Sequence, residues 1–137
     1  MIAKILISVG VFVYLVLIPY LEINHSHVFN SQWPPHARFH EVWQLATNMT
    51  FGVMALWLVW FKHEIRLAAG VSIAVMGGVL FAHAMQGHYG GDVLSGNVSK
   101  TVLGLELAAF IAICVLVMSV VAILLDARAV KQAQQLD

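Results

Sequence analysis

The sequence predicts an all-α integral membrane protein, an antiparallel four-helix transmembrane bundle with both termini in the cytoplasm. Of its 137 residues, 61% are hydrophobic and only 10% are charged, whereas about a quarter of the residues of a soluble domain are charged. Such a chain has too few polar side chains to cover a surface that faces water. The apolar residues also gather in four long segments, and the lysines and arginines lie mostly at one side of them.

Each apolar segment is close to the length of one membrane crossing. A bilayer core of about 30 Å is crossed by about 20 helical residues, and a backbone in hydrocarbon must satisfy its own hydrogen bonds, so each segment is expected to be a helix. The segments run from Ile5 to Leu21, from Val42 to Phe61, from Leu67 to Gln86 and from Thr101 to Leu125. We therefore expect one transmembrane domain, 1–137, with spans over about 5–21, 41–62, 67–87 and 101–125 and a cytoplasmic tail over 127–137.

Prolines and glycines give further detail on the predicted helices. The first segment could be a signal peptide, but Pro19-Tyr20-Leu21-Glu22 offers no small-residue cleavage site, so we expect it to be retained as a helix. Pro35 suits the first turn of the second helix, just outside the membrane. The Gly77-Gly78 pair is expected to mark a close contact of the third helix with another helix.

The orientation follows from the excess of lysine and arginine that cytoplasmic loops carry. With the N-terminus inside, the loops over about 22–35 and 88–100 face the other side, and we expect a bacterial inner (plasma) membrane protein. This orientation places Lys4, Lys62, Arg66, Arg128 and Lys131 inside and only Arg38 and Lys100 outside.

Each predicted helix carries a polar side chain at a similar depth, in the outer third of the bilayer. A charged or polar group is costly when it faces lipid, by about 2.5–3.5 kcal/mol for a carboxylate near the bilayer centre. We therefore expect these side chains to turn inward and to form a polar pocket that opens toward the extracytoplasmic face. They are Tyr14 in the first helix, Asn48 in the second, His83 in the third and Glu106 in the fourth.

These residues suggest acid–base chemistry. An imidazole beside a buried carboxyl can donate or accept a proton, so His83 and Glu106 are the leading catalytic candidates. The other candidates are His40, Glu41, Asn48 and Tyr14. For Asn48 the alternative is a purely structural interhelical hydrogen bond, and for Tyr14 the favoured alternative is an ordinary packed tyrosine.

Seven histidines are present, and most of them lie on the predicted extracytoplasmic side. His36 and His40 are spaced i, i+4, so two imidazoles can reach one cation from one helix face. Histidine suits Zn, Fe or Cu, and the predicted metal ligands are His36, His40, His25, His27 and His88. The alternative is that these histidines sit at the headgroup level, beside the aromatic residues that also favour that level.

Two classes of function are disfavoured by composition. Lys+Arg and Asp+Glu balance at seven each and no basic run is present, so nucleic acid is not an expected partner. The one cysteine, Cys114, can form neither an internal disulfide nor a multi-thiolate metal site.

One stretch resembles a known signature. From Asn30 to His40 the chain reads Asn-Ser-Gln-Trp-Pro-Pro-His-Ala-Arg-Phe-His. This is similar to the pattern Asn-Pro-x-Trp-Pro-Pro-His-Ala-Arg-Phe-His of a family of small four-helix membrane proteins of unknown function, with Ser31 where the family has proline. The resemblance implies the four-helix fold, marks His36, Arg38 and His40, and assigns no reaction.

Better understood families resemble the chain in part. His40, Glu41, His83 and Glu106 are similar in inventory to the emopamil-binding sterol isomerase group, which uses His and Glu inside a helical bundle to shift a double bond. Membrane desaturases and hydroxylases share the His-x-x-x-His spacing, but they need further histidine motifs on the cytoplasmic side, which this chain lacks.

The leading hypothesis is a small membrane enzyme that acts on a lipophilic substrate from the bilayer. Its chemistry would be acid–base and isomerase-like, or metal-assisted as in an oxidoreductase. The alternatives are a membrane protein that binds or transfers a transition metal or haem, with His40 and His83 as axial ligands, and an accessory subunit of a larger membrane complex. A homo-oligomer is compatible with all of these.

Overall fold

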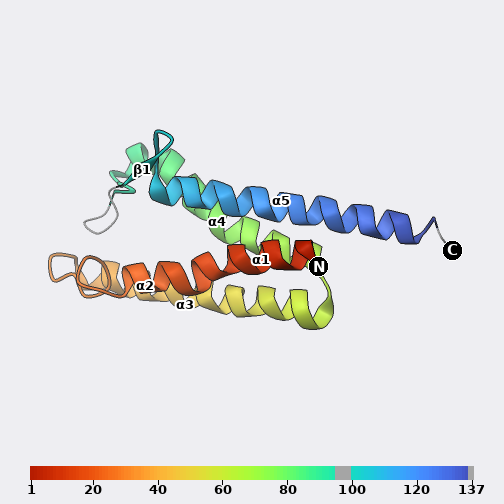
Figure 1. Ribbon diagram of the computed structural model, residues 1–137. Helices are drawn as coiled ribbons and strands as arrows, with labels where there is room; N and C mark the ends of the chain where they lie inside the picture. Colours follow the sequence, from red (N-terminus) through yellow and green to blue (C-terminus); the bar gives the residue numbers. More distant parts are fainter. Residues whose placement is uncertain (95–99, 136–137) are drawn as a thin grey trace.

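The computed structural model of the chain describes residues 1–94 and 100–135. Within these residues, four helices are long and apolar enough to cross a membrane, which confirms the predicted four-helix membrane fold. They run side by side, with both termini at one end of the bundle (Figure 1). The spans are Ile2–Glu22, Pro35–Lys62, Ile65–Tyr89 and Leu107–Ala133.

Two of the spans contain a π-helical turn. The first consists of α1 (Ile2–Phe12), the turn η1 (Val13–Leu17) and α2 (Ile18–Glu22). The second consists of α3 (Pro35–Trp57) and the turn η2 (Leu58–Lys62). The third and fourth spans are the helices α4 (Ile65–Tyr89) and α5 (Leu107–Ala133).

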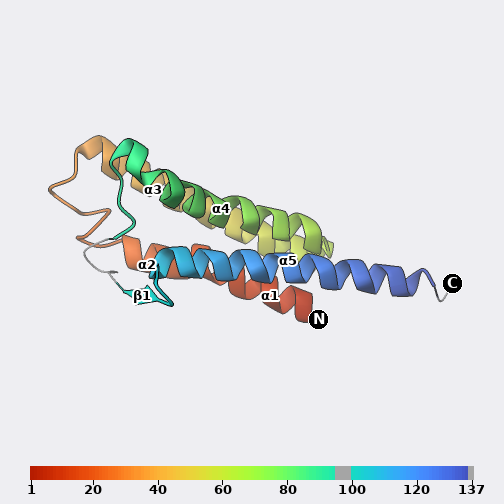
Figure 2. The same ribbon diagram turned by 90° about the horizontal axis from the view of Figure 1, so that it is seen from above.

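The helices alternate in direction around the bundle. The most extensive contact is between α4 and α5, while α1 packs on α5 and α3 and also reaches α4. Helices α3 and α4 meet at the short turn after Lys62 and separate toward the opposite end (Figure 1). Figure 2 shows the same arrangement from above, with the loop before α3 and the strand β1 at that opposite end. We call it the loop end.

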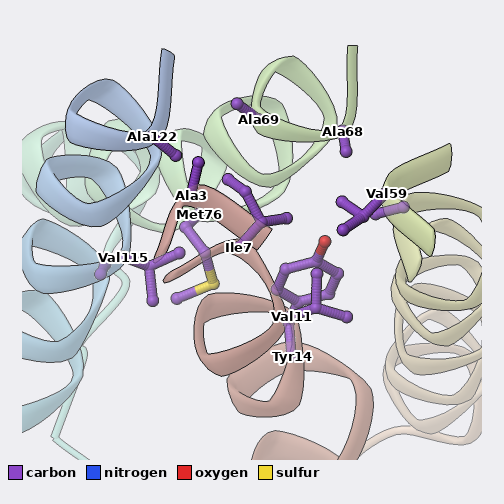
Figure 3. Packing of buried hydrophobic residues seen from close by; sticks show 12 residues of the cluster. Ala3, Ile7, Val11, Tyr14, Val59, Ala68, Ala69, Met76, Val115 and Ala122 are labelled. Carbon is purple, nitrogen blue, oxygen red and sulfur yellow. The ribbon is translucent and has the colours of Figure 1, made fainter. Parts of the chain in front are cut away.

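The first helix packs its buried face at the centre of the bundle. Ala3, Ile7, Val11 and Tyr14 follow the spacing of three or four residues of one helix face and are buried. They point from α1 and η1 toward side chains of the other three spans (Figure 3). A Cβ placed on Gly52 would lie 2.9 Å from Leu15 Cβ, so this glycine allows α3 to approach the first span closely.

Hydrogen bonds join the helices at the end that carries the termini. Lys4 Nζ lies 2.7 Å from His63 Nδ1, which ties the first helix to the turn between η2 and α4. Arg66 Nε donates to Asp126 Oδ2 at 2.8 Å and joins α4 to α5. The direction in which this end faces across the membrane stays a prediction from the lysine and arginine distribution.

The fourth helix begins later than the sequence predicted. In place of a helical turn from Thr101, the chain forms a hairpin of β1 (Thr101–Val102) and β2 (Leu105–Glu106), with Thr101 opposite Glu106. Leu103 and Gly104 have φ angles of 53° and 80°, as a tight two-residue hairpin turn requires. Glu106 therefore precedes α5, while the helix continues to Ala133 through most of the predicted tail.

The expectation for Gly77 and Gly78 was wrong. A Cβ at either position would meet no atom within 4 Å. Within the described residues, neither glycine is therefore needed for a close helix contact, and the space beside them is open.

Candidate functional site

A cavity of about 520 Å³ lies in the half of the bundle next to the loop end. All four spans and both long loops contribute to its lining, and its volume is typical of a site for a small molecule. Its deeper wall is apolar and is built largely by Val13, Leu17, Ile18, Leu45, Val75, Met76, Val79 and Ile111.

Polar side chains line the cavity from four segments. Glu22 is the last residue of α2, and His27 follows in the loop after it. The other polar lining residues are Ser26 and Asn30 in the same loop, Glu41, Gln44 and Asn48 on α3, and Asp92 after α4. Carboxyl, imidazole, hydroxyl and amide groups thus face an otherwise apolar space.

Glu22 is the end of a chain of hydrogen bonds that runs through the loop. Its Oε2 lies 2.9 Å from His27 Nε2, and His27 Nδ1 lies 2.7 Å from Ser26 Oγ. Ser26 Oγ donates to Asn24 Oδ1 at 2.6 Å, and the Ser26 backbone N–H donates to the same oxygen at 2.7 Å. Trp33 packs edge-on against the His27 ring, with 5.4 Å between the ring centroids.

This chain of hydrogen bonds holds one proton between Glu22 and His27. Because the Ser26 hydroxyl hydrogen goes to Asn24, Ser26 Oγ accepts from His27 Nδ1–H. His27 Nε2 then faces a carboxyl oxygen, and the two atoms need a further proton between them. Burial lowers the pKa of His27, which favours the neutral imidazole, with the proton on the carboxyl of Glu22 donated to Nε2.

Glu41 and Asn48 line the same cavity from α3, together with Gln44. Their spacing of three and four residues places the three side chains on one helix face. Two of the predicted catalytic residues, Glu41 and Asn48, are thus brought together in the cavity. Sequence reasoning had not named Glu22 among the candidate site residues.

His83 and Glu106 lie close together, as the polar-pocket hypothesis required. His83 Nε2 is 3.6 Å from Glu106 Oε2, and this distance is too long for a hydrogen bond. The two residues form an ion pair only when the imidazole is protonated. Neither residue lines the cavity: His83 lies one helical turn beyond Val79, and Glu106 directly precedes Leu107. His83 Nδ1 is buried and has no hydrogen-bond partner among the described residues.

Tyr14 does not reach the cavity, contrary to the common polar layer that the sequence suggested. It is fully buried, and its hydroxyl lies 3.1 Å from Ser72 Oγ of α4. Side chains in a helix lean toward the helix N-terminus. The hydroxyl is therefore directed toward the end with the termini, near Val59 and Ala68 (Figure 3). The position of Tyr14 is that of an ordinary packed tyrosine, the alternative favoured for it from the sequence.

The five predicted metal ligands lie at several separate positions in the structure. His36 and His40 are exposed on α3, with their Nε2 atoms 3.0 Å apart. His25 lies against Phe29, His27 is paired with Glu22, and His88 is exposed near the end of α4. Over residues 1–94 and 100–135, no group of three or more His, Cys, Asp or Glu side chains is arranged to hold a metal ion.

The pair of histidines suggested as haem ligands has separate partners. His40 contacts His36, and His83 contacts Glu106.

In the loop that follows α2, sequence reasoning missed Asn24 and Ser26, and it predicted His27 as a metal ligand and not as the partner of Glu22. Asn24, Ser26 and His27 are close in sequence, and an Asn whose side chain accepts from the backbone two residues on is a recognisable turn pattern. That pattern was the available signal for the ordered loop that carries His27.

Comparison of the chain with protein-family models, with curated proteins and with solved structures finds no match.

Proposed function

We propose that this protein is a small membrane enzyme that transfers protons to and from a lipophilic molecule held in the cavity. The observation that carries the proposal is the Glu22–His27 pair, 2.9 Å apart, at the polar side of a cavity whose deeper wall is apolar. The reaction would take place at this pair and at Glu41, and not at His83 and Glu106, which do not line the cavity.

The cavity suits a molecule with an apolar body and a small polar group. The apolar wall accepts hydrocarbon, while Gln44 and Asn48 can donate or accept hydrogen bonds. A polar group of the substrate would otherwise find no partner in the bilayer core, so these amides would orient it.

Two carboxyl groups on different helices support an isomerase-like reaction. Glu22 ends α2, and Glu41 lies on α3. In a double-bond shift, Glu22 would give its proton to one carbon while Glu41 takes a proton from another, so the substrate keeps its atoms and electrons. His27 would then return a proton from solvent to Glu22, while Glu41 releases the proton that it took to solvent. Acid–base steps of this kind contribute about 10²–10⁴-fold in rate.

The site would face the extracytoplasmic side of a bacterial inner membrane. This assignment rests on the positive-inside distribution, since Lys4, Lys62 and Arg66 lie at the opposite end of the bundle from the cavity.

Deuterium incorporation tests the proposal without knowledge of the substrate. Membranes that contain the protein are incubated in D₂O, and the extracted lipids are examined by mass spectrometry for deuterium bound to carbon. We expect incorporation with the wild type and its loss in Glu22→Gln and Glu41→Gln. The matched control is Glu64→Gln, because Glu64 is exposed at the turn before α4 and does not line the cavity. Equal incorporation in all four proteins and in membranes without the protein would refute the proposal.

Metal binding is a second candidate, favoured by the two Nε2 atoms of His36 and His40, which lie 3.0 Å apart on one exposed face. Histidine ligands bind Zn at about 2.0–2.1 Å, so one cation can lie between them. The remaining ligands would come from a second protein.

The metal content of the protein purified in mild detergent tests this candidate. We expect His36→Gln and His40→Gln to release the metal if the candidate is right. His63→Gln serves as the control, because His63 is also exposed but lies at the end of the bundle that carries the termini. A wild type without bound Zn, Fe or Cu argues against it.

A further inference from the structure

A second hollow opens on the flank of the bundle between α3 and α4. This groove of about 450 Å³ is mostly apolar and contains small residues of α4, namely Ala74, Gly78 and Ala82. Gln44, Asn48, Val75 and Val79 line both the groove and the cavity. The two spaces therefore adjoin along these four residues.

We infer that this groove is the lateral passage through which the substrate reaches the cavity, and that it holds the substrate's hydrocarbon chain during the reaction. The inference rests on the proposed function. It narrows the substrate to an amphiphile with one polar group, bound in the cavity, and one long hydrocarbon chain, bound in the groove.

The position of the groove in the bilayer supports a hydrocarbon occupant. On α4 it extends from Val71 to Ala82, about 16 Å along the helix at 1.5 Å per residue, which is about half of the bilayer core. Phe51, Ala74 and Gly78 are exposed there, and on a transmembrane helix the exposed side faces lipid. A Cβ on Gly78 would meet no atom within 4 Å.

The divergence of α3 and α4 places the passage at the right end of the bundle. The two helices separate toward the loop end (Figure 1), which is the half that contains the cavity. Their mutual contact is less extensive than that of α4 with α5. An amphiphile in the outer leaflet would therefore meet the groove beside the cavity.

The polar residues shared by the two spaces explain how the substrate would be selected. A groove wall attracts a hydrocarbon chain no more than neighbouring lipid does, because lipid tails are equally apolar. Gln44 and Asn48, in contrast, offer hydrogen bonds that the bilayer core lacks. The groove would thus govern the rate of access, and the amides would provide the preference for a polar group.

The test compares two substitutions on the same helix. Gly78 and Gly70 are both exposed on α4 and both have open space at the Cβ position, but only Gly78 lines the groove. We expect Gly78→Leu to lower the rate of deuterium incorporation at least about tenfold, equivalent to a barrier higher by about 1.4 kcal/mol, while Gly70→Leu stays near the wild type. Equal rates of deuterium incorporation in the two variants would show that the groove is not the passage, and they would not contradict the proposed function.

A second measurement does not depend on turnover. Palmitic acid with a diazirine in the middle of its chain is photolysed with the purified protein, and the labelled residues are mapped by mass spectrometry. We expect label on Phe51, Val71 and Ala74 of the groove and its decrease in Gly78→Leu. Label spread evenly over these residues and over Ile113 and Val117, which are exposed on α5, would overturn the passage.

The two measurements separate the two proposals. If the wild type incorporates no deuterium, the proposed reaction fails, and the labelling pattern still decides the passage. If Gly78→Leu does not fold, Ala82→Leu replaces it, with Ala84→Leu as its control, because both alanines are exposed on α4 and only Ala82 lines the groove.

Discussion

Glu22 Oε2 lies 2.9 Å from His27 Nε2, so the last residue of the first span is tied to the loop that covers the cavity. The second nitrogen of the same imidazole contacts Ser26 Oγ at 2.7 Å. The imidazole therefore connects a carboxyl group in the cavity with the hydrogen-bonded turn at Asn24. Loss of the proton from this pair would change both the charge in the cavity and the stability of the loop.

Acidification is expected to destabilise the wild type through His27. Burial lowers the pKa of His27 below its ordinary value of 6.5, so between the two pKa values this imidazole binds more protons in the unfolded chain than in the folded protein. The contribution of His27 to the free energy of unfolding consequently rises with pH in this interval. The stabilising contribution is fully present above about pH 6.5 and is lost as the pH falls through the folded-state pKa.

Thermal unfolding in detergent, followed at several pH values from about 7 to about 5, measures this effect. We expect a smaller loss of stability on acidification in His27→Gln than in the wild type. The exposed His25 provides the control His25→Gln, which should keep the wild-type dependence. If all three proteins respond equally to pH, His27 is not the group responsible.

Glu22→Gln is expected to keep the fold while it removes the transferable proton. If the carboxyl is protonated and donates to His27 Nε2, a glutamine amide can donate in its place. The stability should then stay within about 0.5 kcal/mol of the wild type, whereas Glu22→Ala leaves Nε2 without a donor at a cost of about 1–3 kcal/mol. Nitrogen-15 NMR of the His27 ring should show Nδ1 protonated in both the wild type and Glu22→Gln. A cationic imidazole in the wild type would contradict the assignment.

The hydrogen bond between Tyr14 and Ser72 is expected to stabilise the bundle without contributing to the reaction. The two oxygens are 3.1 Å apart and both residues are fully buried. Interhelical hydrogen bonds in membranes contribute about 0.6 kcal/mol on average, so a double-mutant cycle of Tyr14→Phe and Ser72→Ala should give a coupling of that size. A Tyr14→Phe protein of normal stability that has lost deuterium incorporation would instead support the catalytic role predicted from the sequence.

Gly52→Ala tests the close approach of α3 to the first span. The added Cβ would lie 2.9 Å from Leu15 Cβ and 3.3 Å from Tyr14 Cε2, which requires a shift of packed side chains at a cost of about 1–3 kcal/mol. Gly70→Ala is the control, since its Cβ would meet no atom within 4 Å. Unfolding in sodium dodecyl sulfate compares the two, and equal stability would show that the contact relaxes freely.

Hydropathy predicted the four spans because the bilayer imposes both a length and an internally hydrogen-bonded backbone on each crossing. Hydropathy could not predict the hairpin before α5, because the hydropathy of its strands, Thr101–Val102 and Leu105–Glu106, is also compatible with the start of a helix. The hairpin depends instead on positive φ angles at Leu103 and Gly104. Depth counted along helices placed Tyr14 near Asn48. The lean of its side chain toward the helix N-terminus separates the two.

The candidate site was predicted only in part, for a related reason. Periodicity placed Glu41 and Asn48 on one face of α3, and these residues do line the cavity. Glu22 and His27 meet through the turn of a loop, which has no periodicity from which their contact could be inferred. Gly78 shows the converse case, because a small residue is compatible both with close packing and with an open groove.

His83 and Glu106 allow a direct choice between two locations for the chemistry. Their side chains lie 3.6 Å apart beside the cavity but not in its lining, and Glu106 also pairs with Thr101 in the hairpin. If the reaction takes place at Glu22 and Glu41, His83→Gln and Glu106→Gln should lower the rate of deuterium incorporation by less than about tenfold, whereas removal of a general acid or base costs about 10²–10⁴-fold. A larger loss in both of these variants than in Glu22→Gln, with unchanged thermal stability, would move the reaction to the His83–Glu106 pair, because only a group that exchanges protons with the substrate gives a loss of that size without unfolding.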